Sequence, residues 1–178
     1  MYATRAKQIF QAFGNDLNSA PTSWVYALTA IQEFQHSAVG MFDYSASGHA
    51  KVSLSFSSIS DTSISATVEI DLDDGWHVQS DSPAAENLIG TKVSNSDNNW
   101  TLTNAVYPPP ELLSTAFQSD PITVWSDNVQ IKVHLEKNDP GKSEFGPVIE
   151  VQMQACDDKL CLLPETVRLE IPIGAIKG

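Results

Sequence analysis

The fold is decided by the stretch Ser63-Ile64-Ser65-Ala66-Thr67-Val68-Glu69-Ile70-Asp71-Leu72, in which polar and apolar residues alternate without a break. Successive side chains of a β-strand point to opposite faces, so this alternation indicates a strand with one buried face. Lys51-Val52-Ser53-Leu54-Ser55-Phe56 alternates in the same way just upstream. The two runs predict two half-buried β-strands.

Shorter runs of strand character continue downstream of residue 72. Turn-forming clusters such as Asp73-Asp74-Gly75 and Ser126-Asp127-Asn128 separate them. About seven or eight short antiparallel strands in roughly 130 residues are typical of an immunoglobulin-like sandwich. The predicted fold class is therefore mostly β, an antiparallel β-sandwich with further strands at residues 76–78, 100–105, 122–125, 129–135, 148–154 and 167–173.

The residues before about position 45 have a helical pattern instead. Two apolar stripes at helical spacing flank the segment Ser19-Ala20-Pro21-Thr22-Ser23, which is typical of a helix start with a proline near the first turn. We therefore expect an α-helical hairpin over residues 1–45, followed by the sandwich over residues 46–178. The stripes consist of Ile9, Phe10, Phe13 and Leu17, and of Trp24, Leu28, Ile31 and Phe34.

The charge of the chain excludes several kinds of partner. It carries 22 acidic and 10 basic residues, for a net charge of −12. Nucleic-acid binding draws affinity from Lys and Arg contacts to phosphates, and no basic run supplies them, so no nucleic acid is expected as a partner. No stretch reaches the roughly 18 apolar residues of a membrane span, so no direct membrane insertion is expected. Residues 1–10 also lack the apolar core of a secretory signal.

The two cysteines, Cys156 and Cys161, stand at the tip of a predicted hairpin. The runs 149–154 and 166–171 alternate on either side of them, with four residues between the cysteines. Facing residues of a non-hydrogen-bonded antiparallel pair have Cα atoms about 4.5 Å apart, and a disulfide accepts roughly 4.4–6.8 Å. The geometry therefore permits a bond between them.

The spacing alone leaves the role of this pair open. Such a bond closes a short loop, and the stabilisation that a disulfide gives by chain entropy grows with loop length, which favours a redox role. A structural disulfide and two buried free thiols are the alternatives. Asp157 and Asp158 place negative charge beside Cys156 and should raise the pKa of its thiol, which Lys159 partly offsets.

A metal centre or a cofactor is not expected. Zinc needs about four ligands, and two cysteines with scattered histidines make no recognisable set. Hydrolase chemistry has no support, because no nucleophile-elbow motif such as G-x-S-x-G occurs. The histidines are His36, His49, His77 and His134.

The cysteine segment Gln154-Ala155-Cys156-Asp157-Asp158-Lys159-Leu160-Cys161-Leu162-Leu163-Pro164-Glu165-Thr166 resembles the cysteine hairpin of the N-terminal periplasmic domain of the thiol:disulfide interchange protein DsbD. Two further segments are similar to the same family in the same order. One is Gly75-Trp76-His77-Val78-Gln79-Ser80, and the other is Tyr107-Pro108-Pro109-Pro110 with the strands near residues 124–133. The resemblance spans about residues 46–175. In the best-known member five residues separate the cysteines, one more than here.

The resemblance implies an immunoglobulin-like domain outside the cytoplasm, in the periplasm. It implies protein-disulfide reductase activity, with Cys156 and Cys161 as the catalytic redox couple. Thioredoxin-like proteins or domains and a membrane-embedded thiol relay would be the partners. An aromatic loop shields the disulfide in this family, and Phe117 is the candidate for that shield, with an ordinary core phenylalanine as the alternative. A binding or structural sandwich with an inert hairpin disulfide is the competing function.

The helical start resembles a different family. Residues 5–34 are similar to the closing helix pair of the six-hairpin barrel in large thioredoxin-domain proteins. This resemblance implies that the chain is the C-terminal part of a larger polypeptide.

Overall fold

The computed structural model describes residues 41–85, 87–96, 98–115, 120–139 and 146–171. Residues 1–40 of the expected helical hairpin (residues 1–45) and residues 116–119, which include Phe117, lie outside the described residues. In the described part of the chain, no helix is long and apolar enough to cross a membrane.

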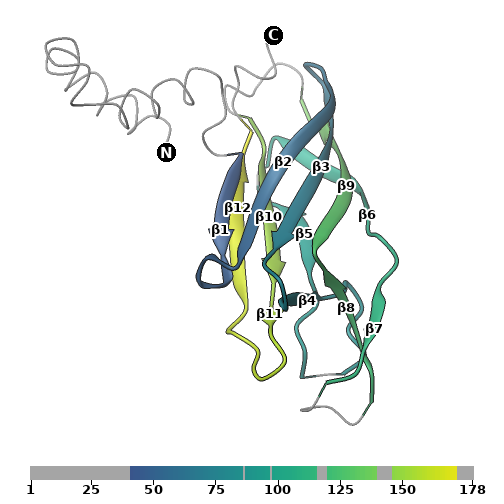
Figure 1. Cartoon of the computed structure of the whole chain (residues 1–178). Helices are drawn as coiled ribbons and strands as arrows, with labels where there is room; N and C mark the ends of the chain where they lie inside the picture. The colour runs from purple at the N-terminus through teal and green to yellow at the C-terminus, as the bar shows by residue number, and fades with distance from the viewer. Residues whose placement is uncertain (1–40, 86, 97, 116–119, 140–145, 172–178) are drawn as a thin grey trace, which may run out of the picture.

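A five-stranded antiparallel sheet forms one layer of the molecule (Figure 1). Its central strand is β3, the alternating segment Ser63–Leu72, which pairs on one side with β2 (Ala50–Ile59), the alternating segment just before it. On its other side, β3 pairs with the ten-residue strand over residues 128–137. In order across the sheet, the strands are β1 (Phe42–Ser45), β2 (Ala50–Ile59), β3 (Ser63–Leu72), β9 (Asn128–Lys137) and β6 (Trp100–Val106).

A three-stranded sheet packs across the first one. Its middle strand, β10 (Val148–Met153), pairs antiparallel with β12 (Glu165–Glu170) and with β5 (Lys92–Asn95). The alternating apolar residues of both sheets meet in one buried cluster, which includes Ile70 and Ile131 from the first sheet and Val151 and Leu169 from the second. The mostly β, immunoglobulin-like sandwich predicted from the sequence is therefore confirmed.

A four-stranded sheet extends the sandwich at the end where the cysteines lie (Figure 1). In order, its strands are β11 (Ala155–Cys156), β4 (His77–Gln79), β8 (Ile122–Ser126) and β7 (Glu111–Leu113). The turn before β4 is closed by a hydrogen bond from the Trp76 amide to the Asp73 carbonyl at 3.0 Å. Gly75 takes a φ of 81° there, a backbone conformation that residues with a Cβ atom rarely adopt.

Strand β1 corrects the boundary expected from the sequence. The sequence pattern places residues 1–45 in the helical hairpin, but Phe42 to Ser45 pair with β2 and the 3₁₀ turn η2 (Ala46–Gly48) joins the two strands. Glu165, the first residue of β12, accepts hydrogen bonds from the Ser45 hydroxyl and the Ala46 amide. These contacts tie β1 to the segment that follows the cysteines. The sandwich therefore begins at Phe42 rather than at residue 46.

Candidate disulfide site

The cysteine loop lies where the chain passes from one sheet to another. β10 and β12 pair as far as Met153 and Glu165, as the alternation on both sides of the cysteines predicted. Beyond Met153 the chain leaves β12, and Cys156 pairs in β11 with His77 of β4. The sequence did not predict this second pairing, because β11 has only two residues and a period cannot be recognised in so short a strand.

Cys156 and Cys161 form a disulfide with an S–S distance of 2.09 Å. Their Cα atoms lie 4.0 Å apart, and the two residues face each other as an isolated antiparallel bridge. This confirms that the two cysteines are close enough to bond, since Cα atoms more than about 7 Å apart cannot be bridged.

The two cysteines differ in burial. Cys156 is fully buried, whereas Cys161 is half-buried and packs against a small apolar cluster of Leu88, Ile122 and Val124. Leu160 and Leu163, on either side of Cys161, are 50% and 85% exposed. An approaching molecule therefore meets Cys161, with exposed leucine side chains beside it, before it meets Cys156.

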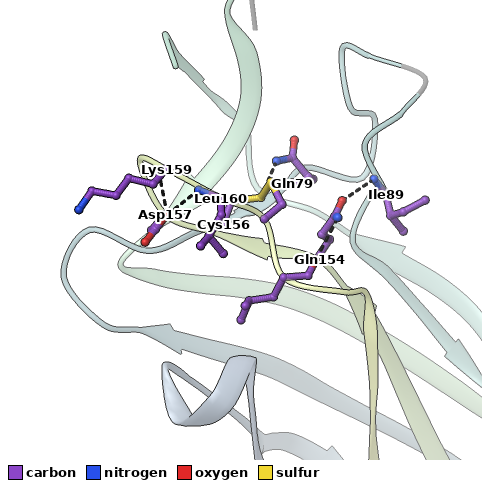
Figure 2. The surroundings of a disulfide bond; sticks show 9 residues. Gln79, Ile89, Gln154, Cys156, Asp157, Lys159 and Leu160 are labelled. Carbon is purple, nitrogen blue, oxygen red and sulfur yellow. Dashed lines mark hydrogen bonds between the residues drawn. A yellow bond between two sulfur atoms is a disulfide. The ribbon is translucent and has the colours of Figure 1, made fainter. Parts of the chain in front are cut away.

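Asp157 shapes the tip of the loop (Figure 2). Its Oδ1 accepts hydrogen bonds from the amides of Lys159 and Leu160, both at 2.8 Å. These two backbone hydrogen bonds lower the pKa of the Asp157 carboxyl, with Leu160 as the larger cause. The carboxylate therefore stays ionised next to Cys156, which is the charge state that the expected rise in thiol pKa requires.

Gln154 joins the loop to a neighbouring segment (Figure 2). Its Nε2 donates to the Leu162 carbonyl at 3.1 Å, and its Oε1 accepts from the Ile89 amide at 3.0 Å. The Leu162 amide also donates to the Ala155 carbonyl at 2.9 Å. The return of the chain after Cys161 is therefore fixed by hydrogen bonds that do not depend on the disulfide.

Strand β4 forms the buried wall behind Cys156. All three of its residues, His77, Val78 and Gln79, are buried. Burial lowers the pKa of His77, although Asp158 and Asp157 act in the opposite direction. The Gln79 Nε2 lies 3.6 Å from Cys156 Sγ, within hydrogen-bond distance for sulfur. Sequence reasoning missed Gln79 and Gln154, because a polar residue in an alternating run looks solvent-facing and carries no signal of burial.

In the described ranges, no three or more His, Cys, Asp or Glu residues lie together as a metal-binding group. Leu113 and Ile122 pair in register at the ends of β7 and β8, and both belong to the apolar cluster against which Cys161 packs. The segment that contains Phe117 connects these two residues.

Comparison with known proteins agrees with this geometry. The family model described as "Thiol:disulfide interchange protein DsbD, N-terminal" matches residues 48–172. The chain belongs to the DsbD N-terminal domain family. The match covers every strand from β2 to β12, including both cysteines, and leaves out β1. No curated protein matches the sequence.

Two solved structures resemble the fold. One is the N-terminal periplasmic domain of ScsB from Proteus mirabilis, with a TM-score of 0.53 and 16% identity, over 73% of this chain and 50% of that one. The other is the N-terminal domain of Neisseria meningitidis DsbD in the reduced form, with a TM-score of 0.48 and 13% identity, over 70% of this chain and 85% of that one. The chain thus spans half the length of the ScsB domain, and the first likeness supports the fold alone.

Proposed function

We propose that this domain relays electrons by thiol–disulfide exchange through Cys156 and Cys161, with thioredoxin-like proteins or domains as its partners. The observation that carries the proposal is the unequal burial of the two cysteines within a DsbD-family domain. Because Cys161 is the less buried of the two, we take its sulfur as the point of attack and the buried Cys156 sulfur as the leaving group.

In the proposed exchange, the first attack is on Cys161, the less buried cysteine. A partner thiolate attacks Cys161 Sγ, the bond between the two cysteines breaks, and Cys156 Sγ takes its electron pair and then a proton. The partner's second thiol resolves the mixed disulfide, which leaves the partner oxidised and both cysteines reduced. In the second half of the relay, the Cys161 thiolate attacks an oxidised partner and Cys156 resolves that mixed disulfide.

Two further parts of the proposal concern shielding and location. Phe117 is proposed as the shield of the disulfide, supported by the placement of Leu113 and Ile122 beside Cys161 at the two ends of its segment. A periplasmic location is supported by family membership, because the ScsB domain of similar fold is periplasmic. A membrane-embedded thiol relay is proposed as one source or acceptor of the electrons.

Trapping tests the mechanism. In the Cys156→Ser variant, Cys161 should capture a stable mixed disulfide with a thioredoxin-like protein, because no resolving thiol remains. The Cys161→Ser variant is the matched control and should capture far less, since its remaining thiol is buried. The measurement is the yield of the mixed disulfide on a non-reducing gel.

Redox titration separates the relay from its competitor, a binding or structural module with an inert disulfide. Titration of the wild-type domain in dithiothreitol buffers should give a reduction potential near the thioredoxin range, about −270 mV or above. A value below about −300 mV, together with no capture by either variant, would identify the disulfide as structural.

A further inference from the structure

Gln79 is held rigidly against the disulfide from the buried side. It is fully buried in β4, and its Nε2 donates to Cys156 Sγ at 3.6 Å (Figure 2). Its backbone is fixed as well, because its carbonyl accepts the Thr91 hydroxyl at 2.6 Å and its amide donates to the Gln154 carbonyl at 3.4 Å. The side-chain amide therefore has a defined place next to this one sulfur.

The stability of the fold does not explain an amide at this position. Gln79 Oε1 is buried without a hydrogen-bond partner, and a disulfide sulfur is a weak acceptor for Nε2. A buried polar group without good hydrogen bonds costs free energy. An apolar residue at position 79, like the Val124 that pairs with it on β8, would therefore stabilise the fold more than glutamine does. A buried unsatisfied group of this kind calls for a role in the chemistry of the site.

We propose that the Gln79 amide stabilises the negative charge that develops on Cys156 Sγ when a thiolate attacks Cys161. This inference rests on the proposed function and names the group that assists its first step. The incoming thiolate bonds to Cys161 Sγ, the disulfide bond breaks, and its electron pair stays on Cys156 Sγ. The hydrogen bond from Nε2 strengthens as this charge develops, because an ionised acceptor binds a donor more strongly than a neutral one. A better-stabilised leaving thiolate departs faster.

The ionisable groups near Cys156 do not provide this stabilisation. His77 is kept neutral by burial, and Asp157 and Asp158 are negative, so they oppose a thiolate. Lys159 lies at the exposed tip of the loop. Gln79 is thus the buried donor that the structure places on Cys156 Sγ among the described residues.

The test compares the rate at which dithiothreitol reduces the disulfide in three proteins. Gln79→Met keeps the length of the side chain and removes the donor, so reduction should be about tenfold slower, the effect of losing one hydrogen bond to a charged group. Gln130→Met, at an exposed position of β9, is the control and should react like the wild type. Equal rates for Gln79→Met and wild type, with the fold intact by circular dichroism, would overturn the proposal.

A second experiment measures whether Gln79 stabilises the negative charge of the Cys156 thiolate. In a Cys161→Ser background, the pKa of the Cys156 thiol, measured from its thiolate absorbance, should rise when Gln79→Met is added. If Gln79→Met does not fold, the side-chain NH₂ signals of Gln79 in the Cys161→Ser protein take its place. These NMR signals should shift with the Cys156 titration, and signals that do not shift contradict the proposal. A slower dithiothreitol reaction without any capture of protein partners would support Gln79 while refuting the relay.

Discussion

His77 is the single residue from which we expect the folded domain to gain sensitivity to acid. It pairs with Cys156 across β4 and β11, is 2% exposed, and leaves its Nε2 without a hydrogen-bond partner. Burial holds its pKa below the usual value of 6.5. The folded protein therefore keeps this imidazole neutral at a pH where the unfolded chain already binds a proton.

The sign of the resulting pH dependence follows from proton binding. Above about pH 6.5 the imidazole is neutral in both states, and below it the unfolded state binds more protons, so the free energy of unfolding falls as the pH falls. The loss ends once the pH passes below the pKa of the folded state. We expect His77→Gln to reduce the loss of stability between about pH 7.5 and about pH 5.5.

Urea denaturation at the two pH values measures this difference. His134→Gln, which removes a half-exposed histidine on β9 away from the disulfide, controls for the loss of any imidazole. An unchanged pH dependence in the His77 variant would show that His77 does not carry the effect.

At the scale of elements, long alternating runs were the predictable part of the fold. β2, β3 and β9 each have ten residues, and their period of two was readable because buried apolar residues alternate with more exposed ones along most of each strand. The short strands β1, β5, β7 and β11 were missed, since two to four residues cannot establish a period. The pairing of Cys156 with β4 depends on contacts far apart in the sequence, so no local pattern contained it.

The candidate site was predictable in the same uneven way. The cysteine pair and its hairpin were recognised from spacing and from a family resemblance. Gln154 was not, although its two hydrogen bonds hold the loop to the segment at Ile89. Its role arises only where the chain leaves β10, because there the side chain turns toward two backbone groups instead of solvent.

Gln154→Ala should therefore loosen the loop. Two hydrogen bonds are lost and two backbone groups are left without this partner, so the free energy of unfolding should fall by about 1–3 kcal/mol. Reduction of the disulfide by dithiothreitol should become faster, because Cys161 is less well held. Gln152→Ala, at an exposed position of β10, is the matched control. A variant with wild-type stability and reduction rate would contradict this role for Gln154.

At the scale of the whole molecule, the core and the disulfide are separate sources of stability. The buried cluster between the five-stranded and three-stranded sheets contains neither cysteine. The disulfide closes a loop with a sequence separation of 5, which gives about 2 kcal/mol by chain entropy. The proposed relay requires a domain that stays folded in both redox states, and this division of stability allows it.

We accordingly expect the reduced domain to stay folded and to lose about 2 kcal/mol of stability. Guanidinium denaturation with and without dithiothreitol measures the difference, and the Cys156→Ser variant should match the reduced wild type. Unfolding of the reduced domain at room temperature would instead assign the disulfide a structural role.

The short span of the disulfide also has a mechanical consequence. A covalent cross-link hides the residues between its two ends from a stretching force, and here the ends are 5 positions apart. At about 3.3–3.6 Å per residue, opening the bond lengthens the fully extended chain by at most about 18 Å. The oxidised and reduced domains should therefore reach nearly the same contour length when pulled from their termini. Oxidation and reduction of the disulfide therefore change only the loop around Cys156 and Cys161, and never cross-link distant parts of the polypeptide.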